Sequence, residues 1–168
     1  MAEFHLYLGN ESAALECLQS AAALFPLDPS IAEALYRAGL RVADLEGMVT
    51  SLRALLSIGS YSSSERDAIR FELARVFKRA GRIDDALAVI EELENSAASL
   101  PVALFRASLL DRAQKFDDAA VFLTEAAERV TLPLAGELSA RALRYRLRSD
   151  HLVEATTLFK SLAKTEIS

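Results

Sequence analysis

A repeated pattern of small and apolar residues runs through the whole chain. Five positions mark the same point in successive copies and lie 34, 38, 33 and 36 residues apart: Ala14, Met48, Ala86, Ala119 and Ala155. A period of this length is typical of stacked two-helix units, in which each unit covers the apolar face of its neighbour. Such stacks offer extended binding surfaces. The period therefore predicts a binding protein and leaves the partner open.

The clearest copy lies between residues 73 and 93. Apolar residues recur there every three or four positions on both sides of Gly81, which predicts two amphipathic helices joined by a tight turn. Gly81 suits the turn because glycine accepts a positive φ at little cost. An acidic pair opens the second helix, where the helix dipole favours negative charge. The stretch 112–126 repeats this arrangement, and the two acidic pairs are Asp84-Asp85 and Asp117-Asp118.

Other local signals predict where the first helix of a pair begins. Ser30 with Glu33, and Ser64 with Asp67 less fully, have the spacing of a capping box. Proline also suits a first helical turn, because it lacks the NH that such a turn leaves unpaired. Residues 57–62 are then a loop, which accounts for the longest spacing. The prolines in starting positions are Pro29, Pro101 and Pro133.

These residues resemble the tetratricopeptide repeat. In that family a small residue of the first helix is followed by an aromatic residue, a turn glycine and an alanine in the second helix. Ala74, Phe77, Gly81 and Ala86 match those places. The resemblance implies an all-α fold, a right-handed α-solenoid of about five antiparallel helix-turn-helix repeats.

The resemblance covers residues 1–168, which we expect to form a single domain. Gly39 replaces the aromatic residue of the second unit, and Met48 replaces its alanine. Met48 is flexible enough to bend into the gap between the two helices. The predicted repeats are approximately 1–26 (truncated), 29–57, 64–95, 100–130 and 133–164.

Charge is divided unequally between the two helices of the later units. The first helices, expected at 66–80, 101–114 and 134–149, carry eleven basic and four acidic residues. The second helices reverse this balance. The resemblance implies that the first helices line a concave groove, so that groove would be basic and would attract an acidic peptide or a chain-terminal carboxylate.

An arginine series keeps step with the repeat. Arg41, Arg79, Arg112 and Arg148 are separated by the same 38, 33 and 36 residues as the repeat positions that follow them. Arginine suits the grip of carboxylates because its planar fork binds them through two parallel hydrogen bonds. Residues on the same helix faces complete a candidate partner-binding groove, whose members are Arg37, Arg41, Phe71, Arg75, Arg79, Leu104, Ser108, Arg112 and Arg148.

A structural role is the alternative for the arginine series. Each member lies in a last helical turn, where a cation interacts with terminal carbonyls and the helix dipole at roughly 0.3–1 kcal/mol. The arginines could also pair with the acidic residues across the turn. Family members that clamp chaperone tails use Lys and Asn at set places, which here hold Phe71, Arg75, Leu104 and Ser108. That clamp is therefore absent.

The sequence predicts no enzyme. It contains no phosphate-binding glycine loop, paired CxxC or nucleophile elbow, and we expect no catalytic residue, cofactor or metal. His5 is expected to pack, and His151 to lie at the surface. Cys17 is the only cysteine and is expected to be a half-buried structural thiol. A lone cysteine favours a reducing, cytoplasmic location.

Composition excludes further classes. Although 52% of residues are hydrophobic, no apolar run reaches the ~18–20 residues of a membrane helix. The net charge of −5 argues against nucleic-acid binding, which normally needs a basic surplus. We expect a scaffold that binds a peptide or protein segment, possibly acidic. The alternatives are a bacterial type III secretion or assembly chaperone for one partner, and the recruitment arm of a larger regulatory or enzymatic protein.

The N-terminal end predicts a further contact. The repeat register places Met1 inside a unit, and the residues that follow it are not the polar cap that a solenoid end needs. This predicts self-association or upstream repeats. The apolar residues concerned are Phe4, Leu6, Tyr7 and Leu8.

Overall fold

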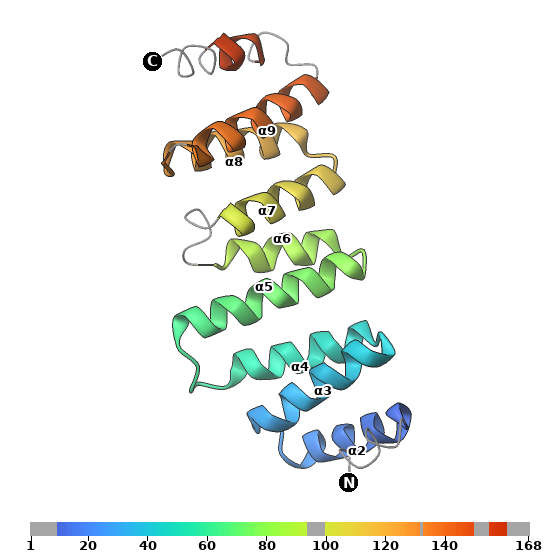
Figure 1. The fold of residues 1–168 in the computed structure, drawn as a ribbon. Coiled ribbons are helices and arrows are strands. Elements are labelled where there is room, and N and C mark those ends of the chain that lie inside the picture. Colours follow the sequence, from blue (N-terminus) through green and yellow to red (C-terminus); the bar gives the residue numbers. More distant parts are fainter. Residues whose placement is uncertain (1–9, 94–99, 132, 150–154, 161–168) are drawn as a thin grey trace. The chain divides into compact units, whose positions relative to one another are not determined.

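The computed structural model describes residues 10–93, 100–131, 133–149 and 155–160, and these residues form helices and the turns between them (Figure 1). The chain divides into two compact units, Met1–Leu93 and Glu94–Ser168. In both, consecutive helices pack against each other. The fold is therefore all-α and built from helical hairpins, as the repeat predicts.

The first unit contains α2 (Glu11–Leu24), α3 (Pro29–Val42), α4 (Leu45–Ser57), α5 (Ser63–Arg79) and α6 (Ile83–Glu91). The hairpins α3–α4 and α5–α6 correspond to the second and third copies of the sequence pattern. Contacts between α4 and α5 join these hairpins. Each copy buries its small or apolar residue completely, since Ala14, Met48 and Ala86 are inaccessible to solvent.

The second unit contains α7 (Leu100–Arg112), α8 (Phe116–Glu128) and α9 (Leu134–Arg148), and residues 155–160 are also helical. Alanines from α7, α8 and α9 pack around two leucines, which allows the three helices to approach closely. This core consists of Ala103, Ala107, Leu123, Ala126, Ala127, Leu138 and Ala142.

Two helix starts differ from the sequence prediction. The side chain of Asp28, not Ser30, caps α3 by accepting hydrogen bonds from the backbone NH groups of Ser30 and Ile31 at 2.8 and 3.3 Å. The capping box of α5 pairs Ser62 with Glu65, not Ser64 with Asp67. Each cap lies two residues before the predicted one, because a cap must directly precede the first helical residue, which is Pro29 in α3 and Ser63 in α5.

Three turns between paired helices have the same backbone geometry. Ala43, Gly81 and Gln114 occupy equivalent positions and have φ values of 57°, 76° and 59°. In each turn the next residue donates its NH to the carbonyl five residues earlier: Asp44 to Gly39, Arg82 to Phe77, and Lys115 to Leu110. This is the hydrogen bond of a Schellman motif, which favours glycine at the left-handed residue. Glycine is present in only one of the three.

Replacing Gln114 by glycine is therefore expected to stabilise the protein by about 0.5–1 kcal/mol, because glycine removes the strain of the left-handed backbone. Gly81→Ala should have the opposite effect, although a Cβ atom at Gly81 would meet no neighbour within 4 Å. Urea unfolding measures both. Gln114→Ala is the control and should leave stability nearly unchanged. Equal stabilisation by alanine and glycine would contradict the backbone explanation.

Gly39 and Met48 compensate for each other. A Cβ atom on Gly39 would lie 2.9 Å from Cγ of Met48, which is closer than real Cβ contacts. Met48 thus occupies the volume that a side chain at position 39 would need. In the α5–α6 hairpin the equivalent positions hold Phe77 and Ala86, where the larger residue comes from the first helix and the smaller from the second.

Candidate functional site

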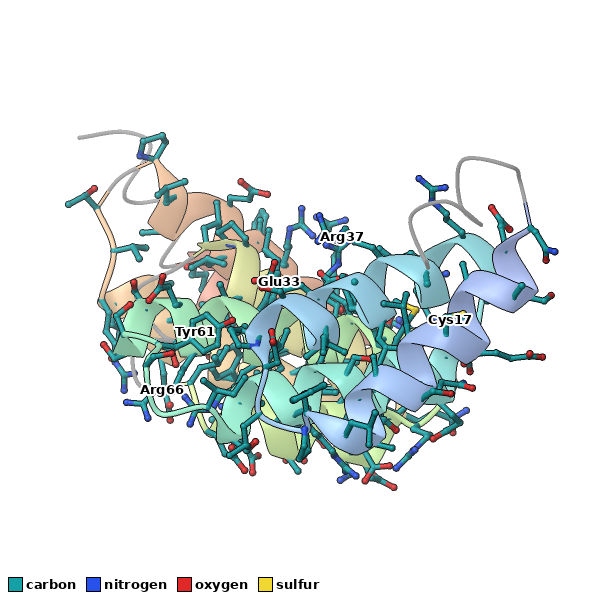
Figure 2. All side chains as sticks on the ribbon, turned by 90° about the horizontal axis from the view of Figure 1, so that it is seen from below. Cys17, Glu33, Arg37, Tyr61 and Arg66 are labelled. Carbon is teal, nitrogen blue, oxygen red and sulfur yellow. The ribbon has the colours of Figure 1, made fainter. Side chains whose placement is uncertain are left out.

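The predicted arginines of the first unit lie on the first helices of its hairpins. Arg37 and Arg41 belong to α3, and Arg75 and Arg79 belong to α5. All four side chains are exposed. Figure 2 shows Arg37 and Glu33 on α3, where their charged atoms approach to 4.0 Å. This exposed pair contributes little to stability, since two solvated side chains must be held in one geometry.

A hydrogen-bonded group joins α3 to α5. The hydroxyl of Tyr36 donates to Glu72 over 2.6 Å, and Arg75 donates to the other oxygen of Glu72 over 2.9 Å. Burial, and then the neighbouring Glu72, raise the pKa of the Tyr36 phenol well above its usual value. Arg75 is therefore engaged within the molecule, and its remaining donors are exposed.

Stability should fall as pH rises above 10.0, the ordinary pKa of the Tyr36 phenol. The folded protein keeps the phenolic proton at a pH where the unfolded chain releases it, so alkali favours unfolding. Urea titrations at increasing pH measure this slope. Tyr36→Phe should reduce the slope and cost about 1 kcal/mol below that pH through the lost hydrogen bond. An unchanged slope in this variant would refute the assignment to Tyr36.

Arg41 and Arg79 differ from Arg37 and Arg75, which both lie in ion pairs. Each lies in the last turn of its helix, and within the described part of the chain neither side chain has a recorded hydrogen bond or ion pair. The cation that binds the acidic pair after the turn is Arg82, whose Nε lies 2.6 Å from Asp85. Two series members of this unit therefore present free guanidinium groups to solvent.

Arg82 is a structural residue that the sequence analysis missed. Besides binding Asp85, it donates to Glu46 at the start of α4 over 3.2 Å, and its guanidinium lies 4.6 Å from the centre of the Phe77 ring. It thus links the two hairpins of the first unit. The repeat gave no signal for this role, because equivalent positions hold Asp44 and Lys115.

The other predicted residues occupy varied environments. Phe71 on α5 is half-buried. In the second unit, Leu104 packs against the alanine-rich core, and the Ser108 hydroxyl donates to the carbonyl of Phe105 over 2.7 Å. Arg112 is exposed in the last turn of α7, and no hydrogen bond or ion pair of its side chain is recorded among the described residues. Packing within the unit thus accounts for Leu104.

Arg148 lies beside a small hollow in the second unit. It forms an ion pair with Asp111 of α7, and its guanidinium lies 4.2 Å from the centre of the Phe116 ring. The hollow has a volume of about 250 Å³. Its lining combines one residue of α7 with four of α9: Asp111, Arg141, Arg144, Tyr145 and Arg148.

Four of these lining residues were absent from the predicted groove. Arg144 could have been found from the repeat, because it precedes Arg148 by four residues as Arg75 precedes Arg79. Asp111 and Tyr145 carry no such signal. Burial, and then the charge of Asp111, raise the pKa of Tyr145, while the arginines around it oppose that shift. The phenol is therefore a hydrogen-bond donor at neutral pH.

The described residues also allow statements about metal ligands, the cysteine and membrane-spanning helices. There, no group of three His, Cys, Asp or Glu side chains is placed to hold a metal ion. Cys17 is a free, half-buried thiol on α2 (Figure 2). His5, His151 and the apolar residues 4–8 lie outside the described residues. None of the described helices has the length and apolar character that crossing a bilayer requires.

Comparisons with known proteins bear on the fold. No protein-family model and no curated protein sequence matches the chain. Among solved structures, the TPR-like repeats of a Podosopora anserina putative kinesin light chain are 19% identical, with a TM-score of 0.61 over 99% of this chain and 94% of that one. A MamA segment from Desulfovibrio magneticus RS-1 is 16% identical, with a TM-score of 0.59 over 98% and 90%. The chain therefore has the fold of the TPR-like helical repeat proteins.

Proposed function

We propose that this protein binds an acidic peptide or protein segment through the exposed arginines of its first helices. The observation that carries the proposal is that Arg41, Arg79 and Arg112 are exposed and that, in the described part of the chain, their side chains form no hydrogen bond or ion pair. Other arginines of the same helices, such as Arg75, are engaged by acidic neighbours. Arg41 and Arg79 end the first helices of consecutive hairpins in the first unit, which fits a ligand that contacts both of these hairpins.

Electrostatics favours an acidic ligand. The second helices α6 and α8 begin with acidic pairs, while α3, α5, α7 and α9 end with basic residues. The free arginines therefore provide local positive charge on a chain whose net charge is −5. Guanidinium groups form charge-assisted, often bidentate hydrogen bonds with carboxylates. An acidic segment is attracted to these helices and repelled by the acidic second helices.

The test uses an array of acidic peptides and matched peptides in which Gln and Asn replace Glu and Asp. The intact protein should bind the acidic peptides, and this binding should weaken as the salt concentration rises. Arg41→Glu combined with Arg79→Glu should weaken binding by at least roughly tenfold, because each free guanidinium becomes a repelling carboxylate. The melting temperature should fall only slightly, because a cation at an exposed helix end contributes roughly 0.3–1 kcal/mol.

The matched control is Arg129→Glu, which makes the same charge change at the exposed end of α8, a second helix. It should leave binding almost unchanged. The contrary pattern would identify the arginines as helix caps: unchanged peptide binding together with a lowered melting temperature in the double variant. In that case the proposed function fails.

A further inference from the structure

The hollow on α7 and α9 is lined by more basic than acidic side chains, with three arginines and one aspartate. Arg148 is paired with Asp111, and Arg141 donates to Glu137 over 2.9 Å. Arg144 is exposed, and no hydrogen bond or ion pair of its side chain is recorded among the described residues. Two of the three arginines of the lining are thus neutralised within the molecule, and the third is available to a ligand.

The size of the hollow restricts that ligand. Its volume of about 250 Å³ lies below the ~300–1,000 Å³ typical of pockets that hold whole small molecules. A single side chain or a chain end fits such a space, with the rest of its molecule outside. Tyr145 adds a hydroxyl donor to the guanidinium groups, so apart from Asp111 the lining side chains donate hydrogen bonds.

We infer that this hollow binds a single carboxylate group of a peptide, with Arg144 as its principal partner and Asp111 as its competitor within the molecule. The inference rests on the proposed function and names one contact site for the acidic segment. One free guanidinium matches a group of one negative charge. The ligand carboxylate forms charge-assisted hydrogen bonds with Arg144. It is also attracted by the positive charge of the Arg148 guanidinium.

Asp111 sets the affinity of the site. Its carboxylate holds Arg148 and repels a second carboxylate that enters the same hollow. Removing that charge should strengthen ligand binding even though it breaks an ion pair. This result would not follow from a purely structural ion pair, whose loss lowers stability and leaves ligand affinity unaffected.

The experiment titrates the isotope-labelled full chain with three short peptides and follows the amide signals of α7 and α9 by NMR. The first peptide has an internal Glu and blocked ends, and the second has Gln in its place. The third is the Gln peptide with a free terminal carboxylate. The first and third distinguish a side-chain carboxylate from a chain terminus. Affinities on the order of 1 mM are expected for so few contacts.

We expect signals lining the hollow to shift with one or both carboxylate peptides and not with the blocked Gln peptide. Arg144→Gln should weaken binding roughly tenfold, and Asp111→Asn should strengthen it several-fold. Arg129→Gln, which removes a charge outside the hollow, is the control. Shifts absent with every peptide, or equal affinities in Arg144→Gln and the unmodified protein, would overturn the inference. If acidic peptides then still bind, and their binding is weakened by the Arg41→Glu and Arg79→Glu substitutions, the proposed function is retained.

Discussion

Replacing Phe77 by alanine is expected to lower the free energy of unfolding by about 3–5 kcal/mol. Phe77 is only 1% exposed and is the largest fully buried side chain among the described residues. Arg53 and Arg82 also lie over its ring, at 5.6 and 4.6 Å from the centre. The substitution therefore creates a cavity at the crossing of α5 and α6 and removes two cation–π contacts, which are worth roughly 0.5–1 kcal/mol each at exposed sites.

Urea unfolding followed by circular dichroism measures this loss. Phe25→Ala is a matched control, because it makes the same chemical change at a residue that is 60% exposed in the α2–α3 turn. It should cost far less, since little apolar surface leaves water there on folding. Similar losses in the two variants would contradict the core role of Phe77.

Met48→Ala is expected to cost about 2–4 kcal/mol, and Gly39→Phe to destabilise the protein by overpacking. Met48 is completely buried and fills the space beside Gly39. The double variant Gly39→Phe with Met48→Ala reproduces the arrangement of Phe77 and Ala86. It should be more stable than the sum of the single losses predicts, by at least about 1 kcal/mol.

A double-mutant cycle with urea unfolding measures this coupling. The control cycle combines Met48→Ala with Leu87→Ala, because Leu87 is also buried but belongs to the next hairpin. In this control cycle, the loss of unfolding free energy in the double variant should equal the sum of the losses in the two single variants. If the losses of Gly39→Phe and Met48→Ala are also additive, then the two side chains do not compete for the same space. The proposed compensation between positions 39 and 48 would then be wrong.

Much of the fold could be predicted because its signals are local. Pro29 marks the first helix of a pair, and Gly81 marks a turn, since each has a backbone preference that acts within a few residues. The turns at Ala43 and Gln114 could not be recognised in this way. Neither residue favours a positive φ, and the packed helices on both sides impose it.

The candidate site was predictable only in part. The period located Arg41, Arg79 and Arg112, and their exposed positions at helix ends follow from the register. The partners of other arginines could not be deduced. Arg82 and Glu46 are 36 residues apart, and Arg148 and Asp111 are 37 apart, so these contacts depend on how neighbouring hairpins stack.

The sequence by itself determined the repeat, the helical hairpins and the register of the arginine series, because small residues and turn signals recur at one period. Only the tertiary structure decided which arginines are neutralised and which remain free. A guanidinium group reaches several angstroms from its backbone, so its partner depends on the neighbouring helix. The tertiary structure also joined Gly39 to Met48, two departures from the pattern that share one packed volume.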